Sequence, residues 1–429
     1  MSRQFLQGSR REAVLALWFS LAVAGGLLVG CDGREPAAQY SSVVVGEAGR
    51  DGGAWPRFRG PVGDSVVTAP DFDPARTTLP SEPTWTTDIG SGYAAPSVSN
   101  GLVYTLGNTM LVDTVRCLRL SDGEEVWSYS YSARSGSYPG PRSTPTIHDG
   151  KLYTLSRDGT LICFDADSGS IIWQRNISRD GIAWQAIYDY ASSVVVWNDL
   201  LLINANRSGL ALRAEDGELA WTSSPAGAAY ATPVVAEIGG RTQALFLTSS
   251  GMHGVDPATG EELWASMWLA GSFDKAADPL PVGNRVFSST AYGLGCALLE
   301  IDGSDATTVW QNNIFESHFA SFVYSNGYIY GNSGSPESPV SYFRCVEFDR
   351  GRERWSAEAD GSGSLIAVGR YLIMLTERGR VVFAELTPDE YRPVAEMSAP
   401  RGIYWTAPVY ADGRLLLRDA AGALYCYEL

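Results

Sequence analysis

The sequence predicts an all-β protein, an eight-bladed β-propeller of four-stranded antiparallel blades that is closed by an N-terminal strand. Three observations predict this fold: a tryptophan motif that returns about every 45 residues, eight similar strand starts, and one tryptophan strand before the first complete unit. Apolar residues after position 30 show no long helical period. Repeats of this length that contain only short strands are typical of blades in a ring.

The tryptophan motif marks the end of each repeating unit. DGEEVW ends at Trp127, and its variants SGSIIW, DGELAW, TGEELW and RGRERW end at Trp173, Trp221, Trp264 and Trp355. A glycine stands four residues before each tryptophan, at Gly123, Gly169, Gly217, Gly260 and Gly351. DGSDATTVW, ending at Trp310, is the same motif with three more residues. LTPDEYRPVAEM (386–397) is a decayed copy, with Val394 near the tryptophan position.

Each unit contains four short strands. GKLYTLSRDGTLICFDADSGSIIW (150–173) has three apolar runs separated by turns, and the Asp-Gly pair between the first two favours a tight hairpin. STPTIHDG (143–150) adds a strand before them. Four strands connected in sequence by tight turns are typical of one propeller blade.

Eight segments resemble the first strand of a unit, and they start at Ala94, Ser143, Ala191, Ala231, Ala277, Ala320, Gly363 and Thr406. The eighth unit ends with LYCYEL (424–429) and has no outer strand of its own. PTWTTDIG (83–90) carries Trp85 and has no unit before it. We therefore predict that this N-terminal strand completes the last blade, because closure removes exposed sheet edges.

The residues before the repeats divide into three segments. Residues 1–30, with Arg3, Arg10 and Arg11 before an apolar run (13–30), predict an export signal. LVGC (28–31) resembles the bacterial lipobox, and this resemblance implies that Cys31 is acylated. An ordinary signal peptide, a single membrane anchor, and Sec or twin-arginine export all remain open. Residues 31–53 are expected to form a flexible linker, 54–82 an N-terminal strap, and 83–429 the propeller.

The strap contains the run WPRFRGP (55–61). Pro56 and Pro61 set an extended path, and Trp55 and Phe58 can bury large faces. We expect the strap to pack against the propeller and hold the closing strand near Trp85, with a contact to a ligand as the alternative. Cys117, Cys163, Cys345 and Cys426 occupy matching places in four units, and Cys296 is close to that place in a fifth, which predicts small, buried and free thiols at all five.

A binding site, if present, is expected at one mouth of the ring, on loops that enter the first strands. The candidates for this funnel are Arg142, Asp274, Lys275, His318 and Trp405, joined by Tyr93, Trp184 and Tyr188. The alternative for these residues is salt bridging between blades and capping of turns. The three histidines lack the spacing of metal ligands, so no metal site is predicted. A net charge of −16 argues against binding to nucleic acid.

CFDADSGSIIW (163–173) and GVDPATGEELW (254–264) resemble the quinoprotein-type repeat. The order of lipobox, WPRFRGP and eight blades resembles the PQQ-like repeat lipoproteins of the BamB family. This resemblance implies that each repeat tryptophan and glycine dock one blade on the next, including Trp85. It also implies a non-catalytic scaffold in the cell envelope, anchored by lipid and facing the periplasm, with envelope proteins or extended peptides as partners. The inner or outer membrane is left open, and a monomer is expected.

The alternative is a dehydrogenase of alcohols or sugars that depends on pyrroloquinoline quinone (PQQ) and calcium. Such enzymes need a carboxylate base, oxygen ligands for calcium and a polarising cation. The alcohol dehydrogenases of this family stack the quinone on a disulfide between adjacent cysteines, but no two cysteines are adjacent in this chain. No run resembles the calcium and base motif of these enzymes. No cofactor is therefore expected under the scaffold reading.

Overall fold

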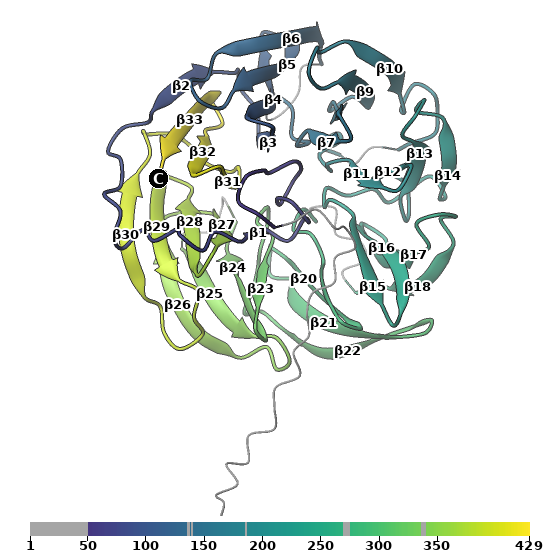
Figure 1. Ribbon diagram of the computed structural model, residues 1–429. Coiled ribbons are helices and arrows are strands. Elements are labelled where there is room, and N and C mark those ends of the chain that lie inside the picture. The colour runs from purple at the N-terminus through teal and green to yellow at the C-terminus, as the bar shows by residue number, and fades with distance from the viewer. Residues whose placement is uncertain (1–49, 135–137, 139, 185–186, 269–274, 336–339) are drawn as a thin grey trace, which may run out of the picture. The chain divides into compact units, whose positions relative to one another are not determined.

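The computed structural model describes residues 50–134, 138, 140–184, 187–268, 275–335 and 340–429. The strands in these ranges form eight sheets that follow one another around a ring (Figure 1). The predicted eight-bladed propeller is confirmed. No helix in the described ranges is long and apolar enough to span a membrane.

The first four blades are antiparallel meanders that run from the axis to the rim. Blade 1 contains β3 (Ser97–Ser99), β4 (Leu102–Thr109), β5 (Val112–Arg119) and β6 (Glu125–Ser132). Blade 2 contains β7 (Thr146–His148), β8 (Lys151–Leu155), β9 (Thr160–Asp165) and β10 (Ile171–Asn176). Blade 3 contains β11 (Val195–Trp197), β12 (Leu200–Ile203), β13 (Leu210–Arg213) and β14 (Leu219–Thr222). Blade 4 contains β15 (Val234–Ile238), β16 (Arg241–Thr248), β17 (Gly251–Val255) and β18 (Glu262–Ser266).

Blades 5 to 7 continue the pattern. Blade 5 contains β19 (Leu280–Val282), β20 (Arg285–Thr290), β21 (Gly295–Asp302) and β22 (Asp305–Asn312). Blade 6 contains β23 (Val323–Ser325), β24 (Tyr328–Ser333), β25 (Ser341–Glu347) and β26 (Glu353–Ala359). Blade 7 contains β27 (Gly363–Val368), β28 (Tyr371–Thr376), β29 (Arg380–Glu385) and β30 (Pro393–Ser398).

Blade 8 joins both ends of the propeller. It contains β31 (Val409–Ala411), β32 (Arg414–Arg418), β33 (Ala423–Glu428) and, as its outer strand, β2 (Trp85–Asp88). β2 pairs antiparallel with β33, and Thr87 lies opposite Leu424. The predicted closure by an N-terminal strand is confirmed.

Blade 7 differs from the four-stranded prediction because it has a fifth strand. β1 (Val66–Val67), from the segment expected to be the strap, pairs in parallel with β27, and Val66 lies opposite Ala367. Sequence periodicity could not indicate this pairing, since a two-residue strand has no pattern of its own.

The hydrophobic core lies between blades. The middle strands are apolar and buried, as in β12, whereas outer strands such as β6 alternate exposed and half-buried residues. Apolar side chains from neighbouring blades form shared clusters, and one cluster joins blades 7, 8 and 1 across the closure. Each blade therefore buries its apolar side chains only together with its neighbouring blades.

Repeat tryptophans connect most neighbouring blades by one hydrogen bond. The Trp127 Nε1–H group donates to the carbonyl of Ala166 in blade 2 at 2.9 Å. Equivalent bonds run from Trp85 to Leu120, Trp173 to Ala214, Trp221 to Pro257, Trp310 to Phe348 and Trp355 to Thr387. The indoles lie against the motif glycines of the next blade, at Gly123, Gly169, Gly217, Gly260 and Gly351.

Trp264 is the exception among these tryptophans. Its Nε1–H group donates to the Gln243 side chain in its own blade at 2.7 Å. The hairpin that it faces in blade 5 is the one with three more residues, and Gly303 in that turn has no atom near the position of a Cβ. Trp264 still packs with Leu299 and Ile301 of blade 5. It therefore contacts the next blade without the hydrogen bond that the other repeat tryptophans make.

Two glycines in blade 2 allow a matched test of this packing. Gly169 has φ 69° and Gly150 has φ 71°, so alanine at either position adopts a similarly unfavourable backbone. A Cβ at Gly169 would lie 2.5 Å from Trp127, whereas a Cβ at Gly150 would meet no atom within 4 Å. We expect Gly169→Ala to lower the free energy of unfolding by about 2 to 3 kcal/mol more than Gly150→Ala, in urea titrations. Equal losses would contradict this packing.

The five cysteines in the described ranges are free and buried. Burial raises the pKa of the Cys163 thiol to about 11 and that of Cys117 to about 12. Such thiols stay protonated at neutral pH and are poor nucleophiles. Cys31 lies outside the described residues.

The segment 55–67 crosses the ring near its axis (Figure 1), and β1 at its end pairs with the last residues of β27. Trp55 exchanges two backbone hydrogen bonds of 2.8 Å with Val98 in blade 1, and the Pro56 carbonyl accepts from Ile147 in blade 2. Farther along, the Ser65 carbonyl accepts from Ala367 in blade 7. The segment thus connects blades 1, 2 and 7, and Trp55 and Val67 belong to the same hydrophobic cluster as Trp85.

Candidate functional site

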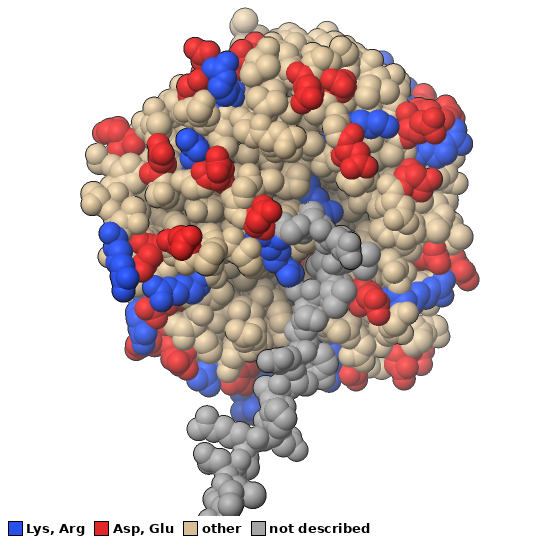
Figure 2. Space-filling view, in the orientation of Figure 1, with Lys and Arg blue, Asp and Glu red and all other residues tan. Residues whose placement is uncertain are grey.

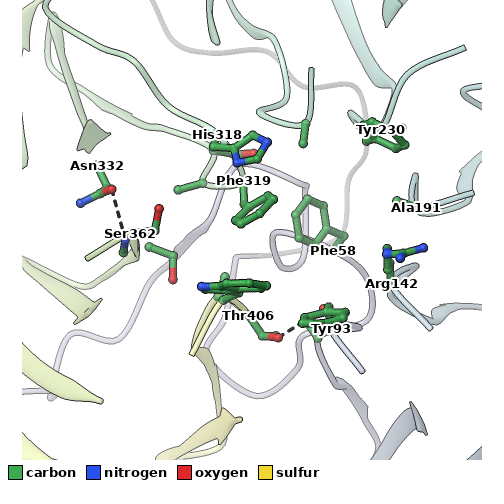
Figure 3. Close-up of a pocket in the computed structure, with 18 of the residues that line it drawn as sticks. Phe58, Tyr93, Arg142, Ala191, Tyr230, His318, Phe319, Asn332, Ser362 and Thr406 are labelled. Atoms are coloured by element: carbon green, nitrogen blue, oxygen red, sulfur yellow. Dashed lines mark hydrogen bonds between the residues drawn. The ribbon is translucent and has the colours of Figure 1, made fainter. Parts of the chain in front are cut away.

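A cavity of about 300 Å³ lies on the axis of the ring, and we call it the funnel. Its walls come from the segments that precede the inner strands, such as Tyr93 before β3 and Thr406 before β31. Several of these segments read AAP, STP, ATP, ADP or TAP, in which proline holds the preceding residue extended. Phe58, Arg59 and Ser65 from the crossing segment form its floor (Figure 3).

Seven rings form a continuous aromatic belt around the funnel. They are Tyr230, Tyr188, Tyr138, Trp405, Phe319, His318 and Tyr292, and successive ring centroids lie 4.0 to 6.3 Å apart. Tyr93 stacks on Trp405 at 5.6 Å. The belt therefore offers ring faces and edges to a flat or apolar group.

The wall formed by blades 6, 7 and 8 contains polar atoms without partners. The backbone N–H of Gly363 donates to Oδ1 of Asn332 at 3.1 Å, which leaves the amide NH₂ for the cavity. Asn332 Nδ2, Ser364 Oγ, Trp405 Nε1 and His318 Nδ1 are buried atoms that find no hydrogen-bond partner among the described residues. Asn332 is only 2% exposed and Ser364 only 7%. A buried polar group left unpaired costs about 1 to 3 kcal/mol, so this wall is suited to a ligand.

Arginines make the opposite wall positive. Arg142 donates to the carbonyls of Tyr188 at 2.7 Å and Tyr138 at 3.0 Å. Asp189 lies 2.5 Å from Arg157 and 3.9 Å from Arg142, so two guanidinium groups share one carboxylate. Burial, and then the charge of Arg157, lower the pKa of Arg142. The two arginines and one aspartate leave one positive charge at this wall.

A buried ion pair supports the floor. Arg59 lies 3.6 Å from Asp278, and it also donates to the carbonyl of Phe322 at 2.6 Å. Asp278 accepts the backbone N–H of Thr232 at 2.8 Å. Burial raises the pKa of Asp278 to about 6, against the opposing effect of Arg59. The floor is thereby connected to blades 4, 5 and 6.

The predicted funnel residues separate into three groups. Arg142, His318 and Trp405 line the funnel together, as do Tyr93 and Tyr188. Lys275 lies outside it, because its Nζ is fully buried and donates to the carbonyl of Thr248 at 2.6 Å. Burial lowers the pKa of Lys275 to about 8. Trp184 is 62% exposed and does not line the funnel, and Asp274 lies outside the described residues.

Sequence reasoning missed several lining residues. Asn332 and Ser364 lie on strands with no distinguishing motif, and Tyr138 and Phe319 lie in loops that do not repeat. Phe58 and Arg59 are partly predictable, since WPRFRGP differs from the repeats and a ligand contact is the alternative role of that run.

The described lining of the funnel does not fit a calcium ion. Calcium takes six to eight oxygen ligands, usually with several carboxylates. The described residues that line the funnel include no Asp and no Glu. Within the described ranges, no group of three or more His, Cys, Asp or Glu side chains is placed to hold a metal ion. The described lining residues likewise include no carboxylate that could act as a base. Burial lowers the pKa of His318 to about 4, which leaves it neutral at pH 7.

Large apolar side chains are exposed on the face where the funnel opens. In each antiparallel blade, the hairpin between the second and third strands lies at the same end as the segment that precedes the inner strand. Eleven exposed residues of the described ranges lie in these hairpins and segments: Met110, Leu111, Tyr138, Trp184, Ile187, Tyr188, Met267, Tyr292, Leu294, Val340 and Ile403. We call this set the funnel face.

The turns at the opposite end carry ion pairs. Arg119 lies 2.7 Å from Asp122, and Arg213 lies 2.5 Å from Asp216. Acidic and basic side chains are interspersed over the face seen in Figure 2. Mixed charge of this kind is typical of a solvated surface.

Comparison with known proteins gives consistent matches. A family model described as outer membrane protein assembly factor BamB matches residues 113–357. The BamB of Shewanella oneidensis is 25% identical over 277 residues, which cover 60% of this chain and 67% of that protein. The BamB of Escherichia coli is 26% identical over 138 residues, which cover 31% of this chain and 32% of that protein. The match thus spans about a third of the Escherichia coli relative.

Two solved structures have the same fold. BamB from Moraxella catarrhalis has a TM-score of 0.59 and 15% identity, and the match covers 80% of this chain and all of that one. The quinohemoprotein alcohol dehydrogenase from Comamonas testosteroni has a TM-score of 0.65 and 13% identity, over 90% of this chain and 81% of that one. At these identities the likeness concerns the fold alone.

Proposed function

Since the chain belongs to the family of the outer membrane protein assembly factor BamB, we propose that it is a non-catalytic scaffold that binds proteins in the cell envelope. The funnel face is the observation that supports a docking role. Ile187 is 70% exposed, Met110 is 90% exposed, and both lie on the same end of the ring as the funnel. Large apolar side chains exposed together on one face are a common feature of protein interfaces.

The partners proposed are envelope proteins or extended peptide segments of such proteins. Aromatic rings and methionine, which are frequent on the funnel face, are enriched at protein interfaces. The name of the family associates its members with assembly of outer membrane proteins, and we extend that role to this chain as a proposal. We also propose that the chain is a monomer anchored through acylated Cys31 and facing the periplasm.

Site-specific crosslinking tests this function. We expect benzoylphenylalanine placed at Ile187 or Ile403 to form adducts with other envelope proteins in living cells. The matched control is the same residue placed at Asp122 or Asp216, at the opposite end of the ring. Adducts only from the control positions, or from neither set, would contradict docking on the funnel face.

Two further measurements examine the anchor and the alternative activity. We expect Cys31→Ala to move the protein from the detergent phase to the aqueous phase, because the variant cannot be acylated at this position and stable membrane attachment needs more than one acyl chain.

We expect no dye reduction with alcohols or sugars after reconstitution with PQQ and calcium. Stoichiometric quinone binding with turnover would defeat the scaffold proposal.

A further inference from the structure

We propose that the funnel is a binding site for a small organic carboxylate, whose ring contacts the aromatic belt. This site goes beyond protein docking, because it concerns the interior of the ring and not its rim. The inference is drawn from three properties of the lining: its unpartnered donors, its charge, and the shape of its apolar part.

The unpartnered donors indicate a ligand that accepts hydrogen bonds. Asn332 Nδ2 and Trp405 Nε1 can only donate. Asn332 cannot turn its amide, since Oδ1 already accepts the Gly363 N–H at 3.1 Å. A ligand with acceptor oxygens would satisfy these two groups, and a ligand made of donors alone would leave both of them unpaired.

The charge of the lining indicates that the acceptor is an anion. Arg142 lines the funnel with its side chain 13% exposed, and it shares Asp189 with Arg157. Burial raises the pKa of the Tyr93 phenol, and the charges of Arg142, Arg418 and Arg157 oppose this rise. No described lining residue is acidic, although the whole chain carries a net charge of −16. This positive region in an acidic protein disfavours cations and favours a carboxylate.

The size and the rings of the funnel restrict the rest of the ligand. A volume of about 300 Å³ lies at the lower end of ligand pockets, so the site suits one small ring. Phe58 rises from the floor between Arg142 and Phe319, and it limits how deep a ligand can sit (Figure 3). Neutral sugars fit less well, because carboxylates are strong acceptors for hydroxyl protons and the described lining includes no Asp or Glu.

Calorimetry on the full-length protein in detergent tests the site with two matched pairs of probes. Benzoate is compared with benzamide, and glucuronate is compared with glucose. We expect at least one anion to bind roughly tenfold or more tightly than its neutral counterpart, because a charge-assisted hydrogen bond to arginine would be lost. The pair that shows the preference distinguishes an aromatic acid from an acidic sugar.

Substitutions connect that preference to the residues. We expect Arg142→Gln to abolish the preference and Arg142→Lys to retain part of it. Trp405→Phe keeps a ring but removes the Nε1 donor, and we expect several-fold weaker binding. Arg350→Gln is the control, because it removes the same charge from an exposed turn at the opposite end of the ring. Thermal unfolding of each variant shows whether it is folded.

Three results would overturn the proposal: no heat of binding from either anion, equal binding of anions and neutral probes, or an unchanged preference in folded Arg142→Gln. If Arg142→Gln does not fold, Trp405→Phe decides, and unaltered anion affinity there counts against the site. Crosslinking from Ile187 is a separate readout. Crosslinks from Ile187 without anion binding would support the scaffold proposal and contradict the carboxylate site.

Discussion

Deletion of residues 83–89 is expected to destabilise the whole ring and not blade 8 alone. β2 is the outer strand of blade 8, so the deletion leaves the backbone of β33 as an open edge. It also removes Trp85, which is 8% exposed, lies in the core shared by blades 7, 8 and 1, and donates to the Leu120 carbonyl at 2.9 Å. Both effects open the ring at its junction.

A milder variant gives the expected magnitude. Trp85→Ala should lower the free energy of unfolding by about 3 to 5 kcal/mol, as large aromatic truncations in cores do. Thr86→Ala is the control in the same strand, because Thr86 is exposed and surface changes usually stay within about 0.5 kcal/mol. A deletion variant that remains monomeric and folded by size-exclusion chromatography and circular dichroism would contradict the closure.

Replacing Arg59 is expected to have the second large effect. Arg59 is 5% exposed and Asp278 is 2% exposed, so Arg59→Met leaves a buried carboxylate without its cation. Removal of one partner of a buried pair usually costs about 3 to 5 kcal/mol. We expect a loss of this size at pH 7 in chemical unfolding experiments.

The pH dependence of that loss has a definite sign. The pKa of Asp278 is already raised to about 6, above its value in an unfolded chain, and loss of Arg59 raises it further. A carboxyl with a raised pKa favours the folded state below its unfolded pKa, and this contribution is lost as the pH rises toward the folded pKa. The deficit of Arg59→Met should therefore be larger at pH 7 than at pH 5.

The double variant separates the pair from its surroundings. Asp278→Asn in the Arg59→Met background removes the buried charge, and we expect it to recover part of the lost stability at pH 7. The single variant Asp278→Asn completes the cycle. If Arg59→Met were as stable as the parent at pH 7, the ion pair would not hold the floor of the funnel.

The propeller fold could be predicted from the sequence because the blades form from local segments of the chain and these segments repeat. A motif such as DGEEVW contains its own turn and its own tryptophan, so one unit predicts the next. The count of eight and the closure by Trp85 followed from comparing units. Trp264 lacks the hydrogen bond that the other repeat tryptophans make to the next blade, because the hairpin that it faces has three more residues.

The funnel could be predicted only in part, because its walls do not repeat. Arg142, His318 and Trp405 were expected there from their places before first strands, and they line the cavity. Lys275 also precedes a first strand, but its side chain donates a hydrogen bond to the Thr248 carbonyl and lies outside the cavity. The floor depends on contacts between residues far apart in the sequence, such as Arg59 with Phe322. No local pattern encodes such a contact.

The pairing of β2 with β33 has a consequence for the order of events during synthesis. Thr87 and Leu424 are made roughly 20 to 70 s apart at ordinary rates of translation. Trp85 can meanwhile dock on Leu120 in blade 1, which is synthesised soon after it. β2 would then lie on the first blade without a paired strand until β33 has been synthesised. Any pause in synthesis would prolong the time for which this strand offers its free edge to other chains.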